Sequence, residues 1–256
     1  MRCLIDGDVL RYRIGFACEY TLYHITNNGD EETVKGKREF KNYIKALEEA
    51  GDVYTYREEE VVEPVENCLH SCKKQLSNIL RRCKSKEYQV YLTGKGNFRE
   101  ELATIKPYKG NRPDRKPKHY DALTEYLVDH WDAEIIEGME ADDALAIAQS
   151  EAHRTQGRRS TCIASIDKDL LQVPGYHYDF YHDKRSTIGP EEGLRRLYQQ
   201  IIAGDSTDNI GGVPGIGSVG ANKLLEGFTL EKDLYSVAKQ AYRDAIEKRS
   251  EEHTSE

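Results

Sequence analysis

Nine acidic residues follow predicted strands or lie at the ends of predicted helices. Two come at or soon after the end of the strand expected at residues 2–6, and two follow the strand expected at 161–166. Three begin the helix expected after a short strand at 133–136, and two lie in the segment GDSTDN at 204–209. The nine are Asp6, Asp8, Glu140, Asp142, Asp143, Asp167, Asp169, Asp205 and Asp208. Their placement makes them candidates for a single acidic cluster.

Carboxylates that converge in this way need cations among them. In open α/β sheets, sites form outside the carboxyl ends of the strands, so three strand ends would deliver acids to one edge. Like charges there repel strongly. All-oxygen ligand sets suit Mg²⁺ or Mn²⁺ rather than Zn²⁺, and two such ions about 4 Å apart can drive phosphodiester cleavage. Taken singly, the acids at 140–143 are also explained as helix capping, and those at 167–169 as a turn.

A glycine-rich segment, GDSTDNIGGVPGIGSVGANKLL, occupies residues 204–225. Its middle lies between a predicted helix end and a helix expected at 219–225. Glycines allow tight turns, with the positive φ that we expect at Gly217, and let the backbone approach a ligand. Helix N-terminal amides bind phosphate oxygens. The residues expected to contact DNA are Gly215, Ile216, Gly217, Gly220 and Lys223. The alternative is an ordinary turn between two helices.

Charge is unevenly distributed along the chain. The formal net charge is −8, yet residues 106–118 (KPYKGNRPDRKPK) hold six basic residues and one acid. A net acidic protein can still bind phosphate through such a basic face. The mean hydropathy is −0.75, and no apolar run is long enough for a membrane span, so we expect a soluble, cytoplasmic protein. The six cysteines form no CxxC pair and are expected to be reduced thiols.

Strand and helix patterns alternate along most of the chain. Strands are expected at 2–6, 88–93, 133–136, 161–166 and 176–181, and helices at 9–18, 64–84, 119–130, 140–153 and 190–203. This alternation predicts an α/β fold with a mainly parallel sheet covered on both faces. Residues 20–62, with a hairpin around 27–30, a helix near 38–50 and a strand near 52–57, say least about function.

The last eight residues, RSEEHTSE, match the translation of a common sequencing-library adapter. We therefore expect residues 249–256 to be a foreign tail, to be left out of reasoning about the fold. The alternative is a polar chain terminus.

Taken together, these segments resemble the 5′ nucleases related to flap endonucleases, such as the bacterial polymerase I 5′ nuclease domain and phage 5′–3′ exonucleases. The resemblance is carried by IDGD (5–8), GNFREEL and PYKGNR (96–112), EADD (140–143), SIDKDL (165–170) and the glycine-rich segment (204–225). It implies a PIN-like core at 1–185, with an arch or clamp at 106–131, and a helix–three-turn–helix DNA-binding region at 186–248.

The resemblance also implies roles for individual residues. Asp6, Glu140 and Asp142 would bind a first Mg²⁺ or Mn²⁺ ion. Asp143, Asp167, Asp169 and Asp208 would surround a second, with Asp205 acting through water. Lys109 and Arg112 would contact the scissile phosphate, and Tyr108 would stack on a base. A K⁺ ion held around Gly215–Gly217 would bridge to duplex phosphate.

One position departs from the family pattern. Better-known members have a metal-binding aspartate before the FR motif, whereas this chain has Gly94 in YLTGKGNFR, with Thr93 beside it. Asp8 is a candidate substitute, and we expect Gly94→Asp to tighten metal binding.

The function implied is that of a 5′–3′ exonuclease and flap endonuclease with a role in DNA replication. Its partners would be DNA with 5′ ends or flaps and no membrane. The protein would be a monomer, in the host cytoplasm if a phage encodes it. Two alternatives are a structure-specific DNA-binding protein with weakened catalysis, and a ribonuclease of the PIN class.

Overall fold

The computed structural model describes residues 1–113 and 115–254. The chain forms two compact units. Unit 1 comprises residues 1–7, 79–114 and 133–256, and unit 2 comprises 8–78 and 115–132. The predicted foreign tail lies outside the described residues at 255 and 256, and the predicted boundary at residue 185 stays a prediction.

A six-stranded sheet in the order β6-β5-β1-β7-β8-β9 forms the centre of unit 1. Its strands are β1 (Arg2–Asp6), β5 (Glu87–Thr93), β6 (Glu134–Ile136), β7 (Thr161–Ala164), β8 (Gly175–Asp179) and β9 (Lys184–Ile188). All neighbouring strands are parallel except β8 and β9. The predicted mainly parallel sheet is therefore confirmed, and the carboxyl ends of β1, β5, β6 and β7 lie at one edge.

Helix α6 (Ala141–Gln156) packs on this sheet. Leu145 is fully buried and lies in one cluster with Leu4, Tyr91 and Ile163 from three neighbouring strands. Parallel strands buried by helices read as continuous apolar runs, which is why these strands were recognisable in the sequence. Two short elements, α4 (Phe98–Leu102) and a 3₁₀ helix (Asp169–Gln172), lie close to the sheet edge that carries the acids.

The C-terminal part of unit 1 is helical. Helix α7 (Pro190–Ala203) leads through the short strands β10 (Gly204–Asp205) and β11 (Ile210–Gly211) to α8 (Ser218–Leu224) and α9 (Glu231–Thr254). Proline at the first position of α7 suits a helix start, because its missing N–H would have no helical partner there. Ile202, Leu225 and Leu234 are fully buried and give this region a core. The expected pair of helices joined by a glycine-rich loop is present in α7 and α8.

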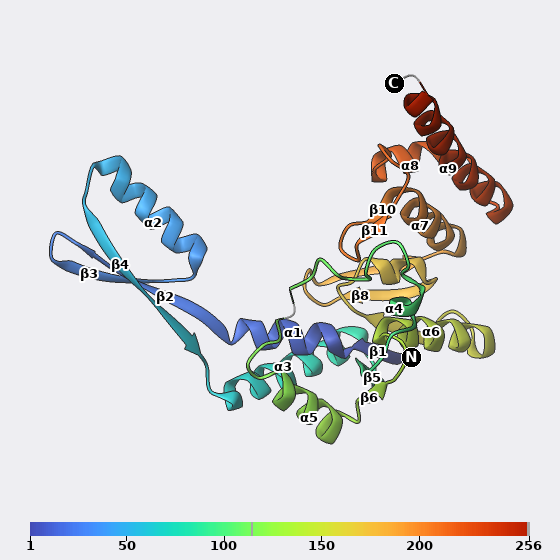
Figure 1. The fold of residues 1–256 in the computed structure, drawn as a ribbon. Coiled ribbons are helices and arrows are strands. Elements are labelled where there is room, and N and C mark those ends of the chain that lie inside the picture. The colour runs from blue at the N-terminus through green and yellow to red at the C-terminus, as the bar shows by residue number, and fades with distance from the viewer. Residues whose placement is uncertain (114, 255–256) are drawn as a thin grey trace. The chain divides into compact units, whose positions relative to one another are not determined.

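Unit 2 contains a three-stranded antiparallel sheet in the order β3-β2-β4, with α2 (Lys37–Ala50) lying along it (Figure 1). The strands are β2 (Glu19–Asn27), β3 (Asp30–Lys35) and β4 (Tyr54–Val62). Asn28 and Gly29, with φ of 51° and 92°, form the tight turn of the predicted hairpin. Tyr23 stacks on Phe40 with ring centroids 4.1 Å apart, joining sheet and helix. Helices α1 (Gly7–Ala17), α3 (Val65–Cys83) and α5 (Tyr120–Trp131) supply much of the rest, α1 and α3 each with one end in unit 1.

Several elements were not predicted. They are α4, the 3₁₀ helix, α9, the antiparallel edge strand β9 and the short strands β10 and β11, while β4 extends past the expected end at residue 57 to Val62. The six cysteines are free and buried, as expected. Within the described residues, no helix is both long and apolar enough to cross a bilayer.

Candidate active site

The start of α6 holds three of the predicted acids. Glu140 is its N-cap, and the Glu140 amide donates to Asp143 Oδ2 at 3.2 Å as part of a capping box. Thr93, at the end of β5, accepts from the Ala141 amide at 2.9 Å. Helix capping therefore explains part of the role of these acids. It leaves most of the carboxylate oxygens available for other partners.

Arg99 neutralises the third of these acids. Its guanidinium donates to both Asp143 oxygens, at 2.5 and 2.7 Å. Burial raises the pKa of Asp143, but the hydrogen bonds and charge of Arg99 outweigh it and hold that pKa below its ordinary value. Arg99 belongs to the motif GNFREEL, but the sequence alone did not indicate a role for it. Its bidentate bond makes it a structural part of the site.

The segment PYKGNR lies against the loop that carries Asp205 and Asp208. The Lys109 amide donates to Asp208 O at 3.1 Å, and Asn111 Nδ2 donates to Ser206 O at 2.7 Å. Arg112 Nη2 donates to Asp208 Oδ1 at 2.6 Å. Two motifs that are about 95 residues apart in the sequence therefore meet through backbone and side-chain bonds.

Tyr108 and Lys109 connect the two groups of acids. The Tyr108 hydroxyl is 2.9 Å from both Glu140 Oε2 and Asp208 Oδ2, and Lys109 Nζ forms an ion pair with Glu140. A phenol has one proton, so it can donate fully to only one of two carboxylates at a time. Burial and the charge of Glu140 raise the pKa of Tyr108, which keeps that proton in place.

The acids after β1 and β7 form a second hydrogen-bonded group. Asp6 is 1% exposed and accepts from Ser165 Oγ at 2.6 Å. The Asp167 amide donates to Ser165 Oγ at 3.0 Å, and the Asp169 amide donates to Asp167 Oδ1 at 2.8 Å. Ser165 was not predicted as a site residue. Only its place just before the acidic turn could have indicated it.

Asp169 lies in an environment of excess negative charge. Burial, followed by the charges of Asp167 and Asp205, raises the pKa of Asp169 to about 6. Asp205 is itself 8% exposed and accepts from Gln200 Nε2 at 2.8 Å and from the Thr207 amide at 2.7 Å. These amide contacts offset burial and hold the pKa of Asp205 below its ordinary value.

A cavity of about 370 Å³ opens beside these carboxylates. Six predicted acids line it, namely Glu140, Asp142, Asp143, Asp169, Asp205 and Asp208, together with Arg99 and Tyr108. Asp6 and Asp167 belong to the neighbouring group around Ser165. Asp8 lies in unit 2, where Arg11 Nη2 is 2.7 Å from its carboxylate, so its role as a metal ligand stays a prediction.

The candidate ligands for the expected divalent cations are already paired with cations of the chain itself. Among the described residues, no three acidic, histidine or cysteine side chains are spaced to hold a metal ion. Their carboxylates instead face Arg99, Lys109, Arg112 and the Tyr108 phenol. The donors are all oxygens, and burial together with the charges of Asp167 and Asp205 raises the pKa of Asp169, so in chemistry the set fits a hard cation.

The glycine-rich loop differs in detail from what we expected. The positive φ belongs to Gly215, at 78°, whereas Gly217 is the N-cap of α8 with φ of −88°. The prediction of a positive φ at Gly217 is wrong, because the chain has already turned two residues earlier. A Cβ at either glycine would meet no atom within 4 Å, so both backbones are open to a ligand, and Lys223 is exposed in the last turn of α8.

Comparison with known protein families places residues 1–198 in the family described as the 5′-3′ exonuclease, N-terminal resolvase-like domain. The chain belongs to this family. It is 29% identical over 183 residues to a 5′-3′ exonuclease of Buchnera aphidicola, covering 66% of this chain and 63% of that protein. It is also 33% identical over 162 residues to DNA polymerase I of Bacillus caldotenax, covering 56% of this chain and 18% of the polymerase.

Solved structures support the same fold. A bacteriophage T5 flap endonuclease complexed with DNA and metal ions superposes with a TM-score of 0.56 at 17% identity, covering 96% of this chain and 87% of that one. A T5 5′-exonuclease with bound zinc ions gives a TM-score of 0.54 at 17% identity, covering 96% and 88%. This 5′-3′ exonuclease family chain spans less than two thirds of the Buchnera relative's length.

Gly94, where this family chain lacks the expected aspartate, lies at the junction of β5 and β6. Its amide donates to Ile136 O at 2.8 Å. A Cβ there would lie 2.7 Å from Glu137 Oε1 and 2.8 Å from Ile135 Cγ2. Glu137 is held in turn by the Lys95 amide, at 2.7 Å from its Oε2. The space that an aspartate side chain would need is therefore partly filled by another carboxylate.

This contact changes the expectation for Gly94→Asp. The single substitution should tighten Mn²⁺ binding little, because the new carboxylate must displace Glu137 and then repels it. Gly94→Asp combined with Glu137→Ala should tighten Mn²⁺ binding more. The Mn²⁺ affinity is measured on the intact chain by titration calorimetry or by electron paramagnetic resonance. Glu137→Ala alone is the control. Equal affinities in the single and double variants would show that Glu137 does not occupy the missing ligand's place.

Proposed function

We propose that this chain is a divalent-metal-dependent 5′–3′ exonuclease with flap endonuclease activity on DNA. One observation carries the proposal: the basic segment 107–112 lies on the carboxylates of the EADD and GDSTDN motifs through Tyr108, Lys109 and Arg112. Cations held over a group of acids are suited to a substrate phosphate that arrives with metal ions. Family membership, and relatives named as 5′-3′ exonuclease and flap endonuclease, support the same activity.

Two Mg²⁺ or Mn²⁺ ions, when bound, would activate a water and stabilise the leaving oxygen. Asp6, Glu140 and Asp142 would hold the first ion. Asp143, Asp167, Asp169 and Asp208 would hold the second, with Asp205 supporting it through water. Hydrogen bonds already orient six of these side chains before any cation arrives, namely Asp6, Glu140, Asp143, Asp167, Asp205 and Asp208.

Lys109 and Arg112 would exchange partners when the substrate binds. Each now neutralises a carboxylate, Glu140 and Asp208 respectively. Metal ions would take over that neutralisation, so both side chains would be free to face the oxygens of the scissile phosphate. Stabilising the negative charge that develops there is worth more than binding the ground state. Stacking of Tyr108 on a base stays a prediction of the family resemblance.

The glycine-rich loop would bind duplex DNA on the same chain. The open backbones of Gly215 and Gly217, with Gly220 and Lys223 in α8, would offer donors and charge to phosphate oxygens. The amide of Ile216 between them donates to Val213 O at 3.1 Å, so Ile216 would hold the shape of the loop. A K⁺ ion bridging this loop to phosphate, a monomeric state and a cytoplasmic location belong to the same proposal. So do the arch at 106–131 and the division of the chain at residue 185.

A 5′-flap cleavage assay tests the proposed function directly. Labelled flap DNA should be cut with Mg²⁺ or Mn²⁺ and not with EDTA, and the matching RNA flap should be cut more slowly. Binding without cleavage would favour a DNA-binding protein with weakened catalysis, which the glycine at position 94 makes a definite alternative. Preferential cutting of RNA would instead favour a ribonuclease.

Asp167→Asn should lower flap cleavage more than about 100-fold while leaving DNA affinity unchanged. The reason is the loss of one metal-binding charge, and metal ions supply several kcal/mol of transition-state stabilisation. Single-turnover rates with Mg²⁺ and binding with Ca²⁺ measure the two effects. Asp129→Asn, an exposed acid on α5, is the control. Residual cleavage above about a tenth of the unmodified rate would contradict the role of Asp167.

Lys109→Ala should reduce turnover by about 10²–10³-fold, with a much smaller loss of flap affinity. The Lys109 side chain forms an ion pair with Glu140, one of the proposed metal ligands, so it should act on developing charge more than on binding. Lys106→Ala, which removes an exposed cation just before this segment, provides the matched control. If Lys109→Ala changes only the salt-dependent affinity, Lys109 is one more contact of the basic segment.

Gly217→Val should weaken duplex binding without lowering the stability of the chain. The structure offers no clash and no positive φ at this position, so a loss of affinity would report a ligand that approaches the backbone. Gly215→Val is the contrasting variant. It should lower stability, because a β-branched residue disfavours φ of 78°. Unchanged binding by Gly217→Val would reduce the loop to a connector.

A further inference from the structure

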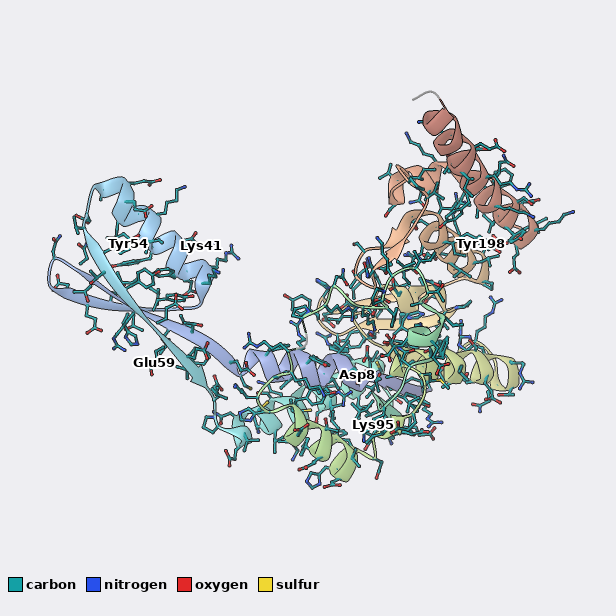
Figure 2. The ribbon with its side chains drawn as sticks, viewed as in Figure 1. Asp8, Lys41, Tyr54, Glu59, Lys95 and Tyr198 are labelled. Atoms are coloured by element: carbon teal, nitrogen blue, oxygen red, sulfur yellow. The ribbon has the colours of Figure 1, made fainter. Side chains whose placement is uncertain are left out.

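Helix α2 in unit 2 carries a group of three exposed cations near its N-terminus. Lys37, Arg38 and Lys41 form this α2 basic patch; Lys37 and Lys41 are four residues apart and Arg38 and Lys41 are three apart, so the three share one side of the helix. Figure 2 labels Lys41 on α2, together with Glu59 and Tyr54 on β4 of the same unit. This part of the chain contributed nothing to the carboxylate site.

The charges of α2 oppose its dipole. A helix is stabilised by acids in its first turn and bases in its last turn. Helix α2 has Lys37 and Arg38 beside Glu39 in its first turn, and it ends with Glu48 and Glu49 and no base. Like charges three or four residues apart add further repulsion. Local helix stability therefore does not account for this arrangement.

The α2 basic patch is also unpaired in acidic surroundings. Residues 19–62 hold 11 acidic and six basic residues, so acidic partners are in excess. Two of the bases form ion pairs with these acids, Lys45 with Glu49 at 3.7 Å and Arg57 with Glu31 at 3.5 Å. A third base, Lys35, lies over the ring of Tyr20. Lys37, Arg38 and Lys41 form no hydrogen bond or ion pair with any described side chain.

We propose that the α2 basic patch is a contact surface for the phosphate backbone of DNA, an inference that rests on the proposed function. Three adjacent, unpaired cations on one exposed helix face complement a row of phosphates. Their orientation against the helix dipole is what a binding surface would retain at the expense of the helix. The patch adds affinity that is independent of base sequence, and it does so from the unit that lacks the carboxylate cluster.

The test replaces the patch with Lys37→Gln, Arg38→Gln and Lys41→Gln in the full chain. Affinity for flap and duplex DNA is measured with Ca²⁺ over a series of salt concentrations. The slope of log K against log salt should become shallower by about 2 to 3, since each phosphate contact contributes about 0.7–0.9. Affinity near 100 mM salt should fall about tenfold or more. Glutamine is a good helix former, so the melting temperature should stay equal or rise.

A matched variant controls for net charge. Lys73→Gln, Lys74→Gln and Lys86→Gln remove three exposed cations on α3 and just after it, and should leave the salt slope nearly unchanged. Equal slopes for the two triple variants would overturn the proposal. So would tight binding of polyglutamate to the α2 basic patch with no change in DNA affinity, which would identify an acidic protein partner.

The cleavage assay separates this inference from the proposed function. If the α2 triple variant binds DNA normally and the unmodified chain cleaves flaps, only the α2 inference fails. If the unmodified chain neither binds nor cleaves DNA, both fail. Reduced affinity with unchanged single-turnover cleavage at saturating enzyme is the result that we expect.

Discussion

Repulsion among carboxylates at one sheet edge is the constraint on which the site depends. The carboxyl ends of β1, β5, β6 and β7 meet there because these strands are parallel. Asp6 and Asp205 are buried and Asp169 is partly buried, and burial together with the charges of Asp167 and Asp205 raises the pKa of Asp169. The fold tolerates this because fixed donors reach each group: Ser165, main-chain amides, and the cations of the segment 107–112. The same unfavourable charge that costs stability provides affinity for a metal ion.

The cations of the segment 107–112 would serve both the folded site without substrate and the site with substrate bound. Without substrate, Lys109 and Arg112 limit the repulsion within the cluster by pairing with Glu140 and Asp208. With metal ions and phosphate bound, the same side chains would have new partners of opposite charge nearby. A site that stays neutralised in both states avoids exposing a bare group of acids. Stability, and catalysis under the proposed function, would therefore both require cations on PYKGNR, a segment anchored by backbone bonds such as Lys109 N to Asp208 O.

The sequence predicted features that depend on neighbouring residues within one element, and it missed features that depend on contacts between distant residues. The strands β1, β5 and β7 and helix α6 were predicted because burial between layers makes their apolar patterns continuous. The short antiparallel β9 was missed because its residues are mostly polar and exposed. The bidentate Arg99–Asp143 bond, the link from Ser165 to Asp6 and the crowding of Gly94 by Glu137 join distant residues. No local pattern encodes such contacts, and the turn at Gly215 rather than Gly217 depends on where α8 begins.

Helix α2 illustrates the opposite case, where a local pattern is legible but its meaning needs the structure. Its amphipathic spacing predicts a helix, and Phe40 confirms which side packs on the sheet. Only the structure shows that Lys37, Arg38 and Lys41 stay unpaired although acids outnumber bases around them. Stability alone would favour exchanging the charges at the two ends of this helix. Positions that break a local rule without a compensating contact are where selection for something other than stability is expected. The acidic cluster breaks such a rule in unit 1, and the α2 basic patch breaks one in unit 2 with charge of the opposite sign. Under the proposed function one polyanion would account for both departures, since phosphates would need cations on a binding surface and metal-holding carboxylates at the point of cleavage.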